Sequence, residues 1–143
     1  MSDANIELLR RAWAAYDQGD AEGFAACLTD DWREYDAEGA VGTLDDERRT
    51  MALHRIAFPD KHTDIHRILA DDEFVACHCT VRATHTGPYL GLEPTRKVVV
   101  VYEMMFNRVR DGKLSETWAV TEGGGFFEQL SGRPAPARLD NMG

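Results

Sequence analysis

The chain has 143 residues, of which 43% are hydrophobic and 29% charged, and its formal net charge at pH 7 is −9. This length suits a single domain with one hydrophobic core. The acidic balance argues against nucleic acids and anionic membranes as partners, because both attract basic surfaces.

The sequence contains neither the pattern of a membrane span nor that of a secretory signal. No apolar run approaches the roughly 18 residues that cross a bilayer, and the opening segment MSDANIELLRRAW lacks a basic stretch followed by an apolar one. The cysteines are three, an odd number, and Cys77 and Cys79 are two residues apart on a predicted strand. This usage favours buried, reduced thiols, and we expect a cytoplasmic protein.

The helical spacing of apolar residues predicts three helices, over residues 3–18, 21–28 and 44–58. Gly19 suits the end of the first helix, and Asp20 is a candidate N-cap for the second. Thr43, with Asp46 three residues later, forms a weak variant of the capping box at the start of the third. Pro59 ends that helix.

After Pro59 the apolar period becomes two, which predicts four strands, over residues 62–70, 73–85, 97–109 and 114–122. The Gly- and Pro-rich residues 86–95 predict a loop, and Asp111-Gly112 predicts a hairpin turn. A short helix is expected within residues 123–132, followed by a loose tail over 133–143. Helices followed by antiparallel strands indicate an α+β fold, in which a curved sheet wrapped on one side by helices forms a cone.

One strand carries an acid in an otherwise apolar run. Residues 98–106, VVVVYEMMF, are apolar or aromatic except for Glu103. An ionised carboxylate without partners is very costly in an apolar interior, so Glu103 faces either water or a cavity that uses it. Strand alternation puts Val99, Val101 and Met105 on the same face as Glu103.

Several segments resemble one known family over nearly the whole chain. These segments are AFPD at 57–60, THTGPYLGLEPT at 84–95, VRDGKLSETW at 109–118 and FEQLSG at 127–132. They are similar to the SnoaL-like polyketide cyclases of the NTF2-like superfamily. The early segments LRRAWAAYDQGD and LTDDWREYD of this chain also match the first helices of that family in style. The resemblance implies an NTF2-like cone around an internal cavity, formed here by a single domain over residues 1–132. It also implies ring closure in an aromatic polyketide by an intramolecular aldol reaction, without metal or cofactor.

When the family's functional residues are carried over position by position, the acid/base that the resemblance implies is missing from this chain. The family's catalytic Asp corresponds to Ala119, its Gln to Glu103, its His to Met105, and its Asn near the end of the second helix to Glu34. Alanine cannot transfer a proton. Either Glu103 or Glu34 has taken over the role, or the reaction needs no strong base.

The candidate catalytic residues are Glu103, Glu34 and His85, each with a structural alternative. Glu103, on the pocket face that the resemblance implies, would have a pKa raised by up to about 3 units if fully buried, unless it pairs with Arg82 or Arg108. Glu34 could instead be a solvated loop residue, and His85 could simply hydrogen-bond its loop. The expected substrate-binding residues are Trp13, Tyr16, Tyr35, Val101, Met105, Thr117, Trp118, Ala119 and Phe126.

We expect no metal site, because His62, Asp64 and His66 share a strand face without a clear closed ligand set. The opposite face of 98–106, with Tyr102, Met104 and Phe106, predicts a homodimer contact.

The leading hypothesis is a cofactor-free cyclase of secondary metabolism that acts on a small hydrophobic, polyketide-type substrate. An apolar cavity would fold the chain into a reactive conformer, with help from a carboxyl group. The missing Asp favours a pericyclic four-plus-two cycloaddition or an epoxide opening over a plain aldol closure. Two alternatives stay open: a non-catalytic binding protein that kept the cone, and an NTF2-like isomerase or hydratase in which Glu34 and Glu103 act together.

Overall fold

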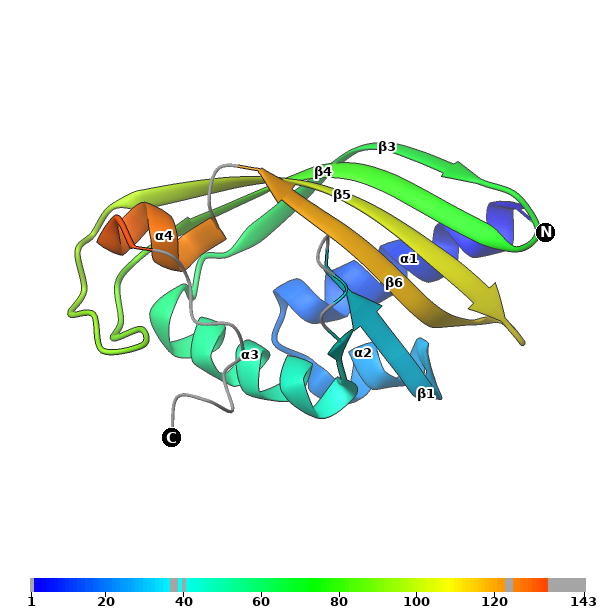
Figure 1. Cartoon of the computed structure of the whole chain (residues 1–143), viewed down its shortest axis with the longest axis horizontal. Coiled ribbons are helices and arrows are strands. Elements are labelled where there is room, and N and C mark those ends of the chain that lie inside the picture. Colours follow the sequence, from blue (N-terminus) through cyan, green and yellow to red (C-terminus); the bar gives the residue numbers. More distant parts are fainter. Residues whose placement is uncertain (1, 37–38, 40, 123–124, 134–143) are drawn as a thin grey trace.

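The computed structural model describes residues 2–36, 39, 41–122 and 125–133, and within them the fold is α+β (Figure 1). The helices are α1 (Ser2–Asp17), α2 (Ala21–Ala26), α3 (Leu44–Ala57) and α4 (Gly125–Ser131). The strands are β1 (Leu28–Tyr35), β2 (Val41–Gly42), β3 (His62–Ala70), β4 (Phe74–Thr84), β5 (Val98–Arg110) and β6 (Lys113–Glu122). Residues 134–143 of the predicted tail lie outside the described residues.

The strands form one curved sheet in the order β2-β1-β6-β5-β4-β3. The long strands β3 to β6 are antiparallel neighbours, whereas β1 runs parallel to β6. In Figure 1 the sheet arches over α1, α2 and α3, which all lie on its inner side, while α4 lies near the start of β5. The expected helix-wrapped curved sheet is confirmed.

The ends of the early helices follow the sequence signals closely. Gly19 adopts φ +70°, a left-handed conformation that suits the turn after α1. The Asp20 carboxylate accepts the Gly23 N–H at 2.9 Å and caps α2. Thr43 and Asp46 form a complete capping box, in which the Asp46 N–H donates to Thr43 Oγ1 and the Thr43 N–H donates to the Asp46 carboxylate.

The segment Leu28–Tyr35 is strand β1, and assigning it to the early helices was wrong. Leu28 pairs with Leu114 of β6, and Tyr35 pairs with Trp118. Leu28 and Trp32 are both buried and stand four residues apart, a spacing that fits one face of a helix and alternate positions of a strand equally well. Pairing with β6 decides the outcome, and helix α2 therefore ends at Ala26 rather than at residue 28.

Two of the segments that carry the family resemblance, the loop after β4 and helix α4, hold separate elements of the fold together by hydrogen bonds. In the loop that follows β4, the N–H groups of Thr86 and Gly87 donate to the Ala57 carbonyl at the end of α3. In α4, the Gln129 amide bonds the backbone of Val100 twice, donating at 2.6 Å and accepting at 3.1 Å. The Gln129 side chain thus bonds backbone groups of β5 that would otherwise need another partner.

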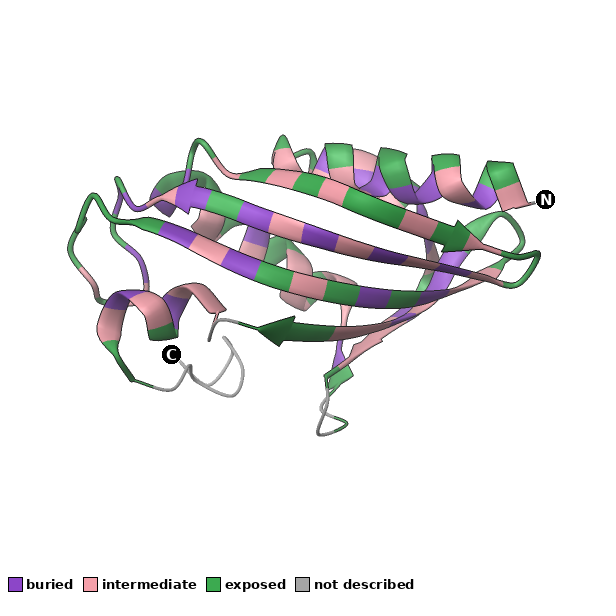
Figure 2. Ribbon diagram, turned by 90° about the horizontal axis from the view of Figure 1, so that it is seen from above, coloured by how far each residue is buried: buried purple, intermediate pink, exposed green. Residues whose placement is uncertain are grey.

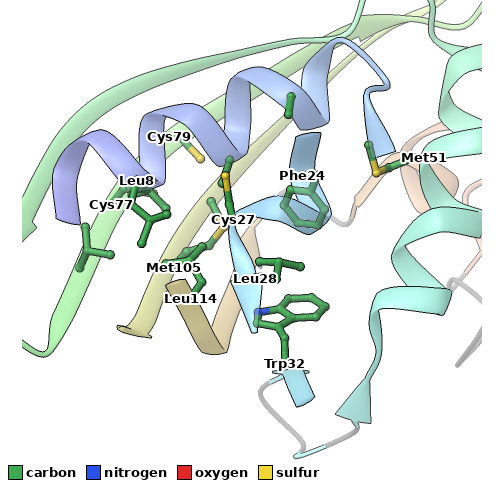
Figure 3. Close-up of a cluster of buried hydrophobic side chains, with 14 residues drawn as sticks. Leu8, Phe24, Cys27, Leu28, Trp32, Met51, Cys77, Cys79, Met105 and Leu114 are labelled. Carbon is green, nitrogen blue, oxygen red and sulfur yellow. The ribbon is translucent and has the colours of Figure 1, made fainter. Parts of the chain in front are cut away.

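The apolar core lies between the helices and the inner face of the sheet. Figure 3 shows its larger cluster, in which Leu8, Phe24 and Trp32 lie near Met105 and Leu114. A second cluster around Phe58, Tyr89 and Phe127 fills the end near α4. The three cysteines, Cys27, Cys77 and Cys79, are free and buried in the larger cluster.

Among the described residues, no helix has both the length and the apolar character that a membrane span requires.

Candidate functional site

A cavity of about 170 Å³ opens between the inner face of the sheet and helices α1, α2 and α3. Aromatic and aliphatic side chains make up much of its wall, including Trp13, Phe24 and Trp32. The ionisable side chains in its wall are Tyr16, Glu34, Glu47, His54, Lys61 and Glu103. The site therefore combines an apolar enclosure with a few polar groups, as small-molecule sites do.

Glu103 lies on the inward face of β5, between Val101 and Met105. Among the described residues none forms a hydrogen bond or an ion pair with its carboxyl group. Burial raises its pKa to about 6, and Glu47 and Asp17 also raise it, whereas the Lys61 ammonium lowers it. Arg82 is exposed, and Arg108 pairs with Glu116 at 2.8 Å and with Glu73 at 3.4 Å, so neither arginine neutralises Glu103.

Lys61 follows α3 and lines the same cavity. Its Nζ lies 4.0 Å from the centroid of the Tyr16 ring, a cation–π contact that holds the amine against α1. Burial lowers the pKa of Lys61 to about 8, and the carboxylates of Asp17, Glu103 and Glu47 oppose that shift. One cavity thus holds a glutamate whose pKa lies just below neutral pH and a lysine whose pKa lies just above it.

Helix α3 presents a polar stripe to the cavity: Glu47, Thr50 and His54, at spacings of three and four residues. The Tyr16 hydroxyl donates to Glu47 Oε2 at 2.9 Å. Burial, reinforced by Glu47, raises the pKa of Tyr16 well above its usual value, so the phenol stays protonated. Burial, reinforced by Lys61, lowers the pKa of His54 to about 3, so its imidazole is neutral at pH 7.

One buried polar atom of a cavity residue, His54 Nδ1, has no hydrogen-bond partner in the described part of the chain. Unpaired buried polar atoms are unfavourable and usually have a partner. Because the His54 side chain lines the cavity, an oxygen-bearing ligand would supply a partner.

The part of the cavity wall beside β6 is fixed by a chain of hydrogen bonds. Trp32 Nε1 donates to Thr117 Oγ1 at 3.0 Å, and the Thr117 hydroxyl donates to Asn107 Oδ1 at 2.7 Å. The Asn107 amide in turn donates to the Val75 carbonyl at 3.1 Å. Because these groups satisfy one another, they fix the shape of this part of the cavity wall.

The structure brings seven of the predicted site residues to this cavity. They are Trp13, Tyr16, Glu34, Glu103, Met105, Thr117 and Phe126. Glu34 reaches it from strand β1, not from a helix end or a solvated loop. Glu34 and Glu103 line the same cavity, which keeps the two-carboxylate isomerase or hydratase chemistry open as an alternative.

The remaining predicted residues lie elsewhere. Trp118 projects to the outer face, where it stacks on Tyr35 with ring centroids 5.5 Å apart, because Thr117 already takes the inward direction. Val101 and Ala119 do not line the cavity: Val101 is 3% exposed, and Ala119 packs against the larger core cluster. His85 is fully buried, its Nδ1 accepting the Thr95 N–H at 3.1 Å, and it positions the 86–95 loop rather than lining the cavity.

Sequence reasoning missed Lys61, Glu47 and His54. The two α3 residues lie at helical spacing on the side of buried Met51, a signal that was available from the sequence. Lys61 had no such signal, because nothing local shows that a residue just after a helix turns inward.

Among the described residues, no group of three or more His, Cys, Asp or Glu side chains could hold a metal ion. His62 instead pairs with Asp64 at 3.0 Å on the surface.

Comparison with known proteins agrees with the family resemblance seen in the sequence. A family model described as SnoaL-like polyketide cyclase matches residues 6–130. Among proteins with curated descriptions, none matches the chain.

Similar solved structures include AclR from Streptomyces galilaeus, a proposed hydroxylase. It is 26% identical, with a TM-score of 0.83 over 99% of this chain and 89% of that chain. IdmH from Streptomyces antibioticus, a proposed polyketide cyclase, is 22% identical, with a TM-score of 0.73 over 87% of this chain and 96% of that chain. A proposed SnoaL-like polyketide cyclase from Jannaschia is 16% identical, with a TM-score of 0.77 over 93% and 95%.

Proposed function

Because the chain belongs to the SnoaL-like polyketide cyclase family, we propose that it closes a ring in a polyketide-type intermediate, with Glu103 as the proton-transferring group. Family membership supports the polyketide cyclase-type role. The choice of Glu103 rests on the cavity: a carboxyl with no hydrogen-bond partner among the described residues, in an apolar wall, has the properties of a general base or acid.

The charge state of Glu103 suits this role. With a pKa of about 6, roughly nine-tenths of the carboxyl is ionised at pH 7. The ionised form can take a proton from a carbon or hydroxyl group, and the raised pKa makes the protonated form a competent acid for the return step. The neighbouring Lys61 ammonium is placed to donate a hydrogen bond to a substrate carbonyl.

The position of Glu103 also offers a replacement for the missing aspartate. Ala119 stands where the resemblance places the family's acid/base, and it pairs with Met105 across β5 and β6. Glu103 lies two residues from Met105 on the same inward face of β5, so a carboxyl is available on the strand next to the Ala119 position.

The size of the cavity bears on the substrate. About 170 Å³ is smaller than the roughly 300 Å³ at the lower end of ordinary ligand pockets. The cavity suits the reacting end of a substrate, held without cofactor in a conformer that brings the two reacting atoms together.

The test is a Glu103→Gln substitution, which keeps the shape of the side chain and removes its ability to exchange a proton. Purified protein is incubated with polyketide intermediates that carry a β-dicarbonyl side chain, and products are followed by liquid chromatography and mass spectrometry. We expect kcat to fall by about 10²- to 10⁴-fold, the usual contribution of general acid–base catalysis. Glu122→Gln, the same change at an exposed position of β6 that pairs with Tyr102, is the matched control and should retain activity.

Unchanged turnover in Glu103→Gln would remove this residue from the mechanism. Tight binding of the intermediates by wild-type protein, with no product after long incubation, would instead support the non-catalytic binding alternative.

A second candidate, hydroxylation, is supported by the likeness to AclR, which extends over 99% of this chain. The two reactions differ in the mass of the product. A ring closure conserves the mass of the substrate or releases water, whereas a hydroxylation adds one oxygen atom.

A further inference from the structure

The amine of Lys61 has no fixed partner. In the described part of the chain it forms no ion pair and no hydrogen bond, and it lies over the face of the Tyr16 ring. Lys61 lines both the inner cavity and a second, more polar cleft between α1 and the end of α3. The amine is therefore enclosed and still reachable by a small molecule.

The carboxylates that act on Lys61 are Asp17, Glu47 and Glu103. Asp17 is engaged by Thr63, whose N–H and hydroxyl donate to its two oxygens at 2.7 and 2.8 Å. Glu47 is engaged by the Tyr16 hydroxyl. Two of the three carboxylates are thus held by other donors, and Glu103 is the one that keeps its lone pairs available to the cavity.

The other ionisable groups that line the cavity or the cleft with Lys61 are Glu34 of β1, Tyr16 of α1, and His54 and Arg55 of α3. Of these, Tyr16 and His54 are neutral at pH 7. Burial brings the pKa of Lys61 to about 8, against the opposing effect of the three carboxylates. About one-tenth of the amine is then neutral at pH 7, roughly 200-fold more than for an ordinary lysine in water. A neutral amine is the nucleophilic form of lysine.

We propose that the Lys61 amine is a nucleophile that condenses with a carbonyl group of a β-dicarbonyl ligand in the cavity to form an imine. This goes beyond the proposed ring closure, which requires only proton transfer by Glu103. The ligand class follows from the site: Lys61 supplies the nucleophile, Glu103 the acid and base, and the unpaired His54 Nδ1 a partner for a second oxygen.

The step balances without an oxidant or reductant. The nitrogen lone pair adds to the carbonyl carbon, and Glu103 carries a proton from the nitrogen to the resulting alkoxide, which becomes the hydroxyl of a carbinolamine. Glu103 then takes up a second proton from solvent and gives it to that hydroxyl, which leaves as water while the C=N bond forms as a protonated imine. The protonated imine would acidify the adjacent C–H group, so that an enamine carbon could attack a second carbonyl and close a ring.

The chain provides its own controls, because its lysines are Lys61, Lys97 and Lys113, and the last two are exposed. The probe is pentane-2,4-dione, which forms an enaminone with amines that absorbs in the near ultraviolet. Reaction is followed at that absorbance, by intact mass (gain of one dione and loss of one water), and by peptide mapping after reduction with cyanoborohydride. Lys61→Met retains the length of the side chain and removes the amine.

At pH 7 we expect Lys61 to react at least tenfold faster than Lys97 and Lys113, and Lys61→Met to lose the fast phase. The rate at Lys61 should reach half its maximum near pH 8, while the rates at the exposed lysines continue to rise beyond pH 10. Equal or slower reaction at Lys61 in the wild-type protein would overturn the inference. Fast reaction at Lys61 together with normal turnover in Glu103→Gln would uphold it and overturn the proposed function instead.

Discussion

Glu103 illustrates how a single residue can be unfavourable for folding and useful for function. Folding moves its carboxyl out of water, so its pKa rises from an ordinary value near 4.5 to about 6. The protonated form is therefore favoured in the folded state. Stability linked to Glu103 is present in full below pH 4.5 and is lost as the pH rises through about 6.

Replacing Glu103 with Gln should therefore stabilise the protein at neutral pH. A shift of about 1.5 units corresponds to about 2 kcal/mol in the free energy of unfolding at pH 7, with little difference below pH 4.5. Urea denaturation of wild-type and Glu103→Gln proteins between pH 4 and 8 measures this difference. The exposed control Glu122→Gln should show no such trend, and a Glu103→Gln protein less stable than wild type at pH 7 would contradict the burial of the charge.

At the residue scale, sequence reasoning located the acid but not its surroundings. Alternation along residues 98–106 was enough to place Glu103 and Met105 on one inward face. The same rule explains why Trp118 faces away from the cavity, because its neighbour Thr117 faces toward it. Lys61 could not be found in this way, because its inward position depends on how α3 ends and on the Tyr16 ring beneath it.

At the scale of elements, the loop after β4 is fixed by a close backbone approach. A Cβ added at Gly87 would overlap the Ile56 carbonyl oxygen at the end of α3, and backbone atoms there cannot move aside cheaply. The same loop donates two N–H groups to Ala57. Glycine at this position is thus required for contact between the loop and α3, the helix that carries Glu47 and His54.

Gly87→Ala should lower the free energy of unfolding by more than about 2 kcal/mol, because the overlap forces the loop away from α3. Gly91→Ala in the same loop is the comparison: Gly91 has φ +82° and open space around it, so the change should cost only about 1 kcal/mol. Thermal and urea denaturation measure both. A Gly87→Ala protein as stable as the Gly91→Ala protein would show that the loop does not need the close backbone contact with α3.

Elements with strong local signals were predicted well, and the exception is instructive. The capped helices, the four long strands and the Asp111-Gly112 hairpin all have turn or capping residues at their ends. Strand β1 has no such signal, and its apolar spacing of four suits either structure. Only its parallel pairing with β6, a contact distant in sequence, decides the conformation.

At the scale of the whole molecule, the outer face of the sheet carries exposed apolar side chains: Leu69, Tyr102, Met104, Phe106 and Val120. Figure 2, seen from above, shows exposed positions recurring along the strands of this face. Together with Trp118, four of these residues surround a shallow apolar groove. Exposed apolar surface of this kind commonly marks an interface, and we expect a homodimer.

Met104→Glu should convert that dimer to a monomer, because it places a charge in the apolar patch of both copies of an already acidic chain. Light scattering coupled to size exclusion measures the mass in solution. Ile56→Glu on α3 is a matched control, because Ile56 and Met104 are each 62% exposed. A monomeric wild-type protein, or a Met104→Glu protein that stays dimeric, would rule out this face as the contact.

The proposed function depends on a carboxyl group that is kept from water inside the cavity and titrates close to neutral pH. Carbon-13 NMR titration of protein labelled at glutamate side chains measures this directly, with the Glu103 signal assigned by its absence in Glu103→Gln. We predict a midpoint at about pH 6. A midpoint near the ordinary value of 4.5 would place the carboxyl in contact with water and contradict the proposed site.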